Sequence, residues 1–555
     1  MSHSPEDARP ARAAELFVRC LENEGVSTIF GIPGEENLDV MDALLDSPIR
    51  FVATRHEQGA AFMADVHGRL TGRAGVCLST LGPGATNLVT GVADATMDGA
   101  PVVAIAGQAP TTRLHKESHQ VIDLVRLFEP VTKYGAQITS PDTIPEIVRK
   151  AFKVAETEKP GCTFIEFPTN VAAAKVWGKA PLRAQSATPP MPPPSKVAQA
   201  AEIISRARNP LIMAGNGVVR AHAAKELLRF AERLNLPVAT TFMAKGVVPS
   251  SHPLSLGAVG LQDRDYVSCG FLRADVIVCV GYDIVEYHPH LWHSEEDRKI
   301  VHIHSAPAEV DEHYIVECGV VGQIGASLDA IAEQARPHPG PPADRDLREF
   351  VLEELASHAD DTECPVTPQK IVWDLRQALG AEDIAVCDVG AHKMWMARMY
   401  PAEAPNTCII SNGLAAMGIA VPGAIAAKLA RPERRVVAVT GDAGFMMNSQ
   451  ELETAIRVGA DIVVLIWNDS AYGLIRWKQL GEFGRESNVA LTNPDFVRYA
   501  ESFGARGYRV KAAEELGDML QQALSEGGVA VIDCPVDYRE NLKLSARLGK
   551  LVCAS

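Results

Sequence analysis

The chain has 555 residues, of which 47% are hydrophobic and 22% are charged, and its formal net charge is −16. This length exceeds what one hydrophobic core supports, and the composition is that of a soluble globular protein with several domains. The acidic balance argues against general nucleic-acid binding, because no basic excess is present to neutralise phosphates.

The cysteines, the N-terminal segment and the lengths of the apolar runs suggest a cytoplasmic location. Eleven cysteines are scattered along the chain without a CxxC pair, a pattern typical of reduced thiols. The N-terminal segment MSHSPEDARPARAAEL lacks the apolar stretch of a signal peptide. No apolar run reaches the roughly 18–20 residues that span a bilayer. We therefore expect a cytoplasmic protein that does not bind membranes.

Short apolar strands alternate with amphipathic helices along the chain, which predicts an α/β fold with parallel sheets covered on both faces. Proline-rich segments at 186–195 and 335–346 interrupt this pattern. They divide the chain into blocks 1–182, 197–335 and 365–545. We expect three doubly wound parallel-sheet domains.

The first block begins with a strand at 26–30 that runs into GIPGEEN. A second short strand leads into the helix of RHEQGAAFMADVHGRLTG, and Glu57 lies near the start of this helix. A carboxyl group among these small apolar residues would be partly desolvated and able to share a proton at neutral pH. The alternative is that Glu57 only complements the dipole at the helix N-terminus.

Two further strands of the first block end in turns that could carry a site. The strand at 74–80 meets LGPGATN, which opens another helix, and the strand at 102–107 leads to a polar loop. This loop carries His115, Lys116, Glu117, His119 and Gln120. The two histidines lack a third metal ligand at suitable spacing, and the loop could equally be an ordinary solvated surface.

The second block offers only a fragment of a dinucleotide-binding fingerprint. Gly215-Asn216-Gly217 follows the strand in PLIMAGNGV, but no further glycine continues the motif. Such a fragment is weak evidence for dinucleotide binding.

The third block contains a run of small and apolar residues, SNGLAAMGIAVPGAIAAKL, at 411–429. Its glycines would let a ligand approach the backbone, and Met417 would present a flexible apolar surface. The same pattern also fits a tightly packed core helix.

Two carboxylates follow neighbouring strands of the third block. The strand at 434–440 ends in Gly441-Asp442-Ala443-Gly444, and the strand at 462–467 ends in Asn468-Asp469. Ligands bind at the carboxyl ends of strands in open α/β sheets, and oxygen ligands beside phosphate suit Mg²⁺. A glycine-containing turn would also offer backbone N–H groups to a diphosphate. The alternative is an ordinary strand–turn–helix unit with a capping aspartate.

Taken together and in order, these segments resemble the thiamine-diphosphate-dependent enzymes of the acetolactate synthase group. The resemblance covers nearly the whole chain and matches the three blocks to pyrimidine-binding, central and diphosphate-binding domains. The matching motifs are GIPGEEN, RHEQGAAFMADVHGRLTG, LGPGATNLVTG, SHQ, SNGLAAMG, GDAGFMMNSQELETA and WNDSAYGLIRW.

The resemblance implies a role for several residues. Glu57 would bond the aminopyrimidine ring of the cofactor, Ala415 would accept from that ring, and Met417 would support its bent form. The implied catalytic positions are Glu57, His119 and Gln120, the implied cofactor contacts are Gly34, Gly390, His392, Lys393, Ala415, Met417, Ala443 and Gly444, and the implied Mg²⁺ ligands are Asp442, Asp469 and the carbonyl of Ala471.

Departures from the family pattern indicate a subtype. The usual Gly-Asp-Gly is Gly-Asp-Ala here, and the usual Asn-Asn is Asn468-Asp469. The segment VGYDIVEYHPHLW, together with His119 and Asp469, resembles the catabolic, flavin-free acetolactate synthases. Bound FAD is therefore not expected, although the segment at 236–260 looks more like the biosynthetic type.

The implied reaction is decarboxylation of pyruvate and joining to a second pyruvate, which gives 2-acetolactate and CO₂. The family builds such sites between subunits, so a homodimer or homotetramer is expected. Two alternatives remain open: another 2-oxo acid decarboxylase or carboligase with an aldehyde or acyl-CoA acceptor, and a non-catalytic binding protein that retains the fold.

Overall fold

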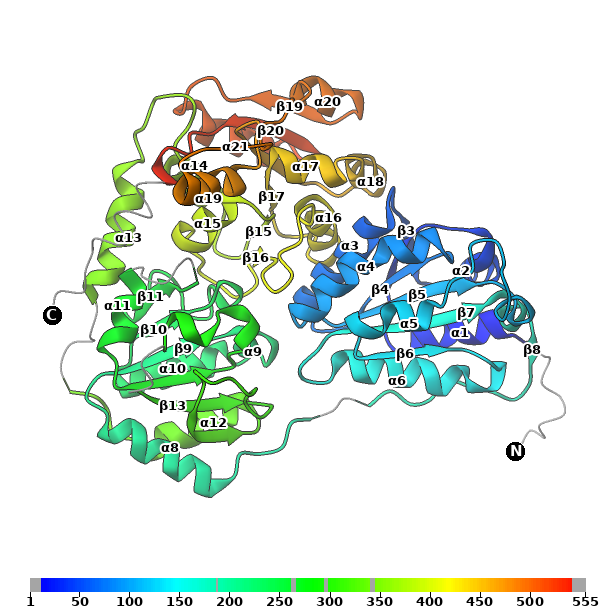
Figure 1. Ribbon diagram of the computed structural model, residues 1–555, viewed down its shortest axis with the longest axis horizontal. Coiled ribbons are helices and arrows are strands. Elements are labelled where there is room, and N and C mark those ends of the chain that lie inside the picture. Colours follow the sequence, from blue (N-terminus) through cyan, green and yellow to red (C-terminus); the bar gives the residue numbers. More distant parts are fainter. Residues whose placement is uncertain (1–10, 186–187, 261–265, 294–297, 340–344, 542–555) are drawn as a thin grey trace. The chain divides into compact units, whose positions relative to one another are not determined.

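The computed structural model describes residues 11–185, 188–260, 266–293, 298–339 and 345–541. Three six-stranded parallel sheets form the framework of these residues, beside a short antiparallel pair of β1 (Ala11–Arg12) and β8 (Lys175–Val176) (Figure 1). The predicted α/β fold with three parallel sheets is confirmed. None of the described helices is long and apolar enough to cross a membrane. The nine cysteines described in detail are free thiols, and all except Cys364 are buried.

The first sheet has the strand order β3 (Arg50–Ala53), β2 (Thr28–Gly31), β4 (Gly75–Ser79), β5 (Val102–Gln108), β7 (Cys162–Pro168) and β6 (Tyr134–Gln137). One face packs against α1 (Ala13–Asn23), α2 (Leu38–Leu44) and α6 (Ile144–Glu156). The other face carries α3 (Glu57–Thr71) and α4 (Pro83–Met97). These two helices approach closely at Gly91, where only the lack of a side chain leaves room: a Cβ on Gly91 would lie only 2.5 Å from the Cβ of Ala61.

The third sheet has the order β16 (Cys408–Ile410), β15 (Ile384–Cys387), β17 (Val436–Gly441), β18 (Val463–Asn468), β20 (Ala530–Pro535) and β19 (Arg506–Arg509). Numbered by chain order within each sheet, the first and third sheets both read 2-1-3-4-6-5. The strand order reverses between the first and third strands of each sheet, a position called the topological switch point. In open α/β sheets, ligands bind at the switch point, beyond the carboxyl ends of the strands. The third sheet shares its core with α14 (Pro368–Ala378), α15 (Ala391–Met399) and α21 (Glu515–Ser525).

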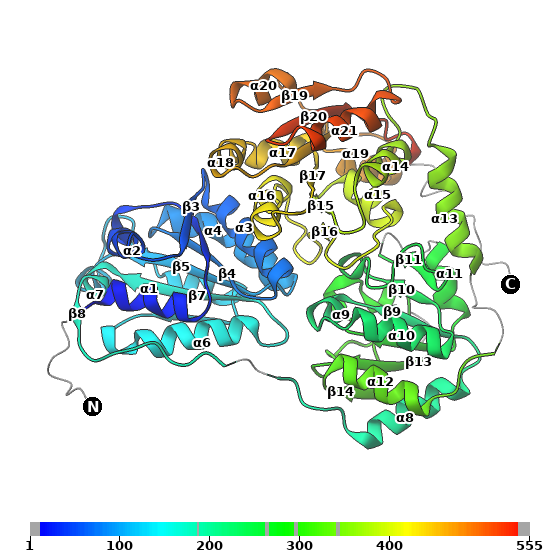
Figure 2. The ribbon, with the colours of Figure 1, turned by 180° about the vertical axis from the view of Figure 1, so that it is seen from behind.

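The central sheet has the order β11 (Ser255–Ala258), β10 (Val238–Thr240), β9 (Pro210–Ala214), β12 (Val276–Val280), β13 (Lys299–His304) and β14 (Val316–Val321). In chain order this reads 3-2-1-4-5-6, the arrangement of dinucleotide-binding folds, with its switch point between β9 and β12. α8 (Pro194–Arg206), α10 (Ala224–Leu234) and α12 (Ile324–Gln334) pack on one face (Figure 2).

The described residues gather into two compact units. The first unit combines the described chain up to residue 185 with segments 414–431 and 448–460, and the second holds the other described residues. Two helices of the predicted third block, α16 (Ala420–Ala430) and α18 (Glu451–Val458), therefore belong to the first unit. α16 packs against α3 there. The predicted domain boundaries themselves stay predictions.

Candidate active site

Glu57 is the first residue of α3 and follows the end of β3, as the sequence predicts. Its side chain is 7% exposed, and its Oε2 accepts a hydrogen bond from Asn87 Nδ2 of α4 at 3.0 Å. Gly84 lies against the other oxygen, since a Cβ there would come within 3.2 Å of Oε1. The carboxyl group is therefore buried and held by a neutral donor on a second helix.

Two glycine-containing turns meet at Thr80, and one of them lies against this carboxyl group. A Cβ on Gly34 would lie 2.6 Å from the Cβ of Thr80, and a Cβ on Gly84 would lie 2.9 Å from Cγ2 of the same threonine. Thr80 Oγ1 also donates to Glu36 Oε2 at 2.6 Å. Gly34 and Thr80 follow β2 and β4, the strands at the switch point of the first sheet. The structure thus brings Gly34 and Glu57 to one sheet edge.

The polar loop after β5 also reaches this edge. Gln120 has φ +60°, and a Cβ on Gly82 would lie 2.6 Å from the Gln120 carbonyl oxygen. His119 and Gln120 are exposed. Among the described residues no group of three or more His, Cys, Asp or Glu side chains is arranged to hold a metal ion. The loop is therefore an exposed polar segment that lies against Gly82.

Ala415 and Met417 lie in a loop between β16 and α16. The helix begins only at Ala420, so the core-helix interpretation does not hold for these two residues. Ala415 has φ +55°, and the intervening Ala416 N–H donates to the buried Asp94 Oδ1 of α4 at 3.4 Å. Both side chains are half-buried. A non-glycine residue in this conformation costs energy, so surrounding contacts must hold the loop.

In the second unit, Asp442 begins α17 (Asp442–Asn448) directly after β17, and Asp469 follows β18. Asn493 Nδ2 donates to Asp442 Oδ2 at 2.6 Å and to Asn468 Oδ1 at 3.1 Å. Burial and the charge of Asp442 raise the pKa of Asp469 to about 7. Burial likewise raises the pKa of Asp442. The carboxylates lie close enough to repel each other, and a divalent cation would relieve that repulsion.

The turn after β15 presents nitrogen donors at the switch point of the third sheet. Gly390, with φ +157°, precedes α15, and a Cβ on it would lie 2.9 Å from the His392 ring. Burial lowers the pKa of His392 to about 3, so the ring is neutral. Its Nε2 is buried and has no hydrogen-bond partner among the described residues. Lys393 Nζ donates to Asn412 Oδ1 at 3.3 Å. The ammonium group of Lys393 here would suit the oxygens of a bound anion.

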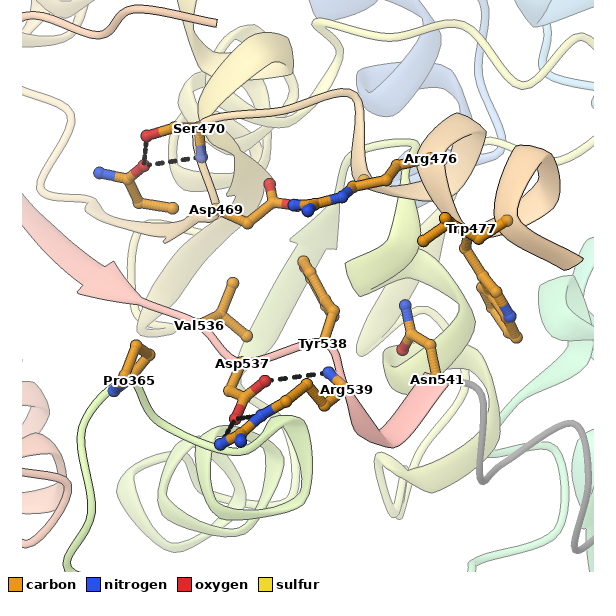
Figure 3. Close-up of a pocket in the computed structure, with 13 residues that line it drawn as sticks. Pro365, Asp469, Ser470, Arg476, Trp477, Val536, Asp537, Tyr538, Arg539 and Asn541 are labelled. Carbon is orange, nitrogen blue, oxygen red and sulfur yellow. Dashed lines mark hydrogen bonds and ion pairs between the residues drawn. The ribbon is translucent and has the colours of Figure 1, made fainter. Parts of the chain in front are cut away.

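A cavity of about 410 Å³ opens beside Asp469. In Figure 3 the Asp469 carboxylate and the Arg476 guanidinium point toward each other. The charge of Arg476 lowers the pKa of Asp469 and so opposes part of the rise caused by burial. The cavity is lined by Pro365, Asn468, Asp469, Ser470, Gly473, Arg476, Trp477, Leu480, Val536, Asp537, Tyr538, Arg539 and Asn541.

The switch point of the central sheet is filled by the chain itself. Asn216 N–H donates to both carboxylate oxygens of Glu286, at 3.1 and 2.9 Å, and Thr241 Oγ1 donates at 2.5 Å. A Cβ on Gly215 would lie 2.8 Å from the same carboxylate. Glu286 therefore occupies the turn where a dinucleotide diphosphate would have to bind, and the weak fingerprint at 215–217 gains no structural support.

Three polar residues that hold the site residues or the backbone beside them were not predicted from the sequence: Asn87, Glu451 and Asn493. Asn87 and Glu451 stand in motifs quoted above, but nothing in the motifs shows their partners. Asn493 stands in no motif, and its contact with Asp442 spans 51 positions of the chain. No signal in the sequence around these residues indicates their partners.

Comparison with known proteins gives matches along almost the whole chain. Family models described as the N-terminal TPP binding domain, the central domain and the C-terminal TPP binding domain of thiamine pyrophosphate enzymes match residues 11–127, 197–331 and 388–534. The acetolactate synthase of Bacillus subtilis is 38% identical over 96% of this chain and 95% of its own length. The catabolic acetolactate synthase of Raoultella terrigena is 36% identical over 97% of each chain. A probable acetolactate synthase large subunit of Methanocaldococcus jannaschii is 37% identical, over 97% of this chain and 94% of its own.

Proposed function

Because this chain belongs to the acetolactate synthase family of thiamine-diphosphate-dependent enzymes, we propose that it condenses two pyruvate molecules to 2-acetolactate and CO₂. Two pyruvate anions and one proton balance one acetolactate anion and one CO₂. The observation that carries the proposal is the near full-length similarity to proteins named acetolactate synthase. The residues that could bind a cofactor or metal lie at the switch points of the two sheets with the order 2-1-3-4-6-5, which agrees with the proposed function.

The residues of the second unit fit the diphosphate end of the cofactor and its metal. Thiamine diphosphate, when bound, supplies the nucleophilic carbon and the electron sink for decarboxylation. The buried Nε2 of His392 and the mutual repulsion of Asp442 and Asp469 support this fit. The proposed Mg²⁺ ligands are Asp442, Asp469 and the Ala471 carbonyl, and the proposed diphosphate contacts are Gly390, His392, Lys393, Ala443 and Gly444.

The residues of the first unit fit the pyrimidine end. Glu57 would hold or release a proton at a ring nitrogen of the bound cofactor, and the hydrogen bond from Asn87 would orient it for that exchange. Met417 and the carbonyl of Ala415 would support the ring from the loop before α16, and Gly34 would allow close approach. Gln120 and His119 would orient the substrate carbonyl from their exposed loop.

We further propose that Glu57 of one subunit completes a site with Asp442 of a second copy. Exposed apolar side chains support an interface between two copies of the chain. Examples are Met446 and Met447 of α17 and Phe483 of α19 (Gly473–Phe483). Mixing inactive Glu57→Gln and Asp442→Ala subunits tests this. A shared site in a C2 dimer predicts recovery of about a quarter of the wild-type activity. No recovery from mixed subunits would place both residues in a site within one chain.

We propose that the enzyme works without flavin. The engagement of the Gly215–Gly217 turn by Glu286 supports this, since the carboxylate uses the backbone donors that a diphosphate would need. The visible absorption spectrum of the purified protein tests it directly. A yellow protein with a flavin spectrum would contradict the proposal.

The reaction product distinguishes the proposed synthesis of 2-acetolactate from the alternative functions. Purified protein with Mg²⁺, thiamine diphosphate and pyruvate should consume pyruvate and yield acetoin after acid treatment. Pyruvate consumption without acetoin would indicate a different acceptor, such as an aldehyde or acyl-CoA. No consumption despite measured cofactor binding would favour a binding protein.

A further inference from the structure

The three residues between β3 and α3 determine where Glu57 stands. Within this turn, Thr54 Oγ1 donates to the His56 carbonyl at 3.1 Å, and His56 Nδ1 accepts from the Gln58 N–H at 3.1 Å. The β2–β3 ladder ends at Ala53, before the backbone N–H groups of Arg55 and His56. Their partner decides the entry angle of α3, and hence the place of the Glu57 side chain at its first position.

That partner is the carboxylate of Glu451, the first residue of α18. Arg55 N–H donates to its Oε1 at 3.0 Å and to its Oε2 at 3.3 Å, and His56 N–H donates to Oε1 at 3.0 Å. Thr454 Oγ1 donates to Oε2 at 2.6 Å and so orients the group from one turn further along α18. Glu451 is fully buried. Its contact with Arg55 spans 396 positions of the chain.

The fit around this carboxylate is close. A Cβ on Gly59 would lie 2.8 Å from Glu451 Oε1, so only glycine leaves room at the first turn of α3. Burial raises the pKa of Glu451, and the hydrogen bonds from Thr454, Arg55 and His56 act in the opposite direction. A buried acid with this set of donors is held in one geometry.

We propose that Glu451 is a positioning residue that fixes the backbone of Arg55 and His56 and thereby aims the Glu57 carboxyl group. The proposal rests on the proposed role of Glu57 at the cofactor. Glu451 does not itself touch the reacting atoms. Its effect passes through two backbone N–H groups that immediately precede Glu57.

The outer rim of the same junction provides a matched control. Arg55 Nε pairs with Glu453 Oε2 at 2.8 Å, and Glu453 also pairs with Arg457 at 2.9 Å. The side chains of Arg55 and Glu453 are 56% and 27% exposed. Exposed pairs of this kind contribute little. Glu453→Gln therefore changes a neighbouring acid on the same helix without touching the buried donors.

The test compares Glu451→Gln with Glu453→Gln in the full-length protein. In Glu451→Gln a single uncharged amide oxygen has to accept from both backbone N–H groups, and the NH₂ group takes the place of Oε2, which accepts from the Arg55 N–H and from Thr454 Oγ1; hydrogen bonds to a neutral acceptor are weaker than those to a carboxylate. In the cofactor-free protein, amide hydrogen exchange of the peptide that covers residues 54–57 should rise by about tenfold or more in Glu451→Gln. It should stay at the wild-type rate in Glu453→Gln.

With thiamine diphosphate and Mg²⁺ added, the second readout is hydrogen–deuterium exchange at the reactive carbon of the cofactor. Glu451→Gln should slow this exchange by about tenfold or more, while the affinity for thiamine diphosphate and Mg²⁺ stays within about threefold of wild type. Unchanged amide exchange at 54–57 would overturn the proposal. So would raised amide exchange with normal cofactor exchange, because Glu451 would then be only structural.

A milder variant covers the case in which Glu451→Gln does not fold. Thr454→Val removes the hydroxyl that orients Glu451 but leaves both backbone donors paired, and smaller changes of the same sign are expected in both readouts. Wild-type values in both would overturn the proposal. If the wild-type protein fails to turn over pyruvate, the proposed function fails, whereas the amide-exchange result still stands or falls by itself.

Discussion

Asn87 and Glu57 lie on different helices, and the side-chain amide of Asn87 donates to Glu57 Oε2 at 3.0 Å. Asn87 is in α4 and Glu57 opens α3, so the bond spans the close contact between these helices. Because amide nitrogen carries no formal charge, Asn87 orients the carboxyl group without forcing it to remain ionised. This suits an acid that must exchange a proton.

Glu57→Gln is expected to lower turnover of pyruvate by about 10²–10⁴-fold, because glutamine keeps the shape but cannot exchange the proton. Acetoin formed after acid treatment reports turnover, and calorimetric titration reports the binding of thiamine diphosphate. We expect the affinity to change little. Full turnover by this variant would show that Glu57 does not have the assigned role.

Asn87→Ala should weaken turnover less than Glu57→Gln, because the variant keeps the Glu57 carboxyl group and loses only one hydrogen bond that orients it. The same acetoin measurement checks this order. A larger loss for Asn87→Ala than for Glu57→Gln would mean that Asn87 contacts the cofactor or the substrate itself.

Replacing each of the two proposed Mg²⁺ ligands, Asp442 and Asp469, by the uncharged asparagine should change the Mg²⁺ dependence of activity to different extents. Asp442 is 1% exposed and accepts a hydrogen bond from Asn493, whereas burial and the charge of Asp442 raise the pKa of Asp469 to about 7. After removal of metal by EDTA, Asp442→Asn should raise the Mg²⁺ concentration for half-maximal activity by about tenfold or more. Asp469→Asn should retain activity with a smaller shift, because asparagine is the residue that the family resemblance places at this position. Equal effects of the two variants would contradict this assignment.

Arg69 is surrounded by three buried aspartates in the first unit. Its guanidinium lies 2.7 Å from Asp65, 2.6 Å from Asp98 and 3.7 Å from Asp94, and all three aspartate side chains are fully buried. Arg69→Met would leave these carboxylates without the cation and should lower the free energy of unfolding by about 3–5 kcal/mol. Urea unfolding followed by tryptophan fluorescence measures this loss.

Arg73→Met is the control for this prediction. Arg73 pairs with Glu156 at 3.3 Å, but its side chain is 49% exposed. Its loss should cost at most about 1 kcal/mol. Similar losses for the two arginines would show that burial of the aspartates around Arg69 carries no extra penalty.

Glu286 should make stability depend on pH. Burial and the neighbouring Asp283 raise the pKa of Glu286 from its ordinary value of 4.5 to about 7, against the opposing effects of Thr241 and Arg220. The folded state then binds this proton more tightly than the unfolded state. The resulting stabilisation is complete below pH 4.5 and is lost as pH rises through 7.

Thermal unfolding of the wild type and Glu286→Gln between pH 5 and pH 8 tests this linkage. The wild type should lose stability relative to the variant as the pH rises. Because glutamine also leaves a backbone donor less well satisfied, a constant difference is expected in addition. A difference that does not vary with pH would mean that Glu286 has an ordinary pKa.

Much of the local structure could be predicted from the sequence because its determinants are local. The start of α3 at Glu57 and the strands that end before Asp442 and Asp469 follow from apolar runs and glycine-containing turns. The loop that holds Ala415 and Met417 was harder to predict. Its small apolar residues fit a helix equally well, and only the tertiary structure shows the positive φ of Ala415 and the contact of Ala416 with Asp94.

By itself, the sequence determined the α/β class, the parallel sheets and the family, because apolar periodicity and short motifs are encoded by neighbouring residues. The tertiary structure alone decided the strand orders 2-1-3-4-6-5 and 3-2-1-4-5-6, and the filling of the central switch point by Glu286. It alone also paired Glu451 with Arg55 and His56, and Asn493 with Asp442. Each of these contacts joins residues far apart in the chain, and buried polar groups acquire such partners only when the packed sheets and helices bring them together.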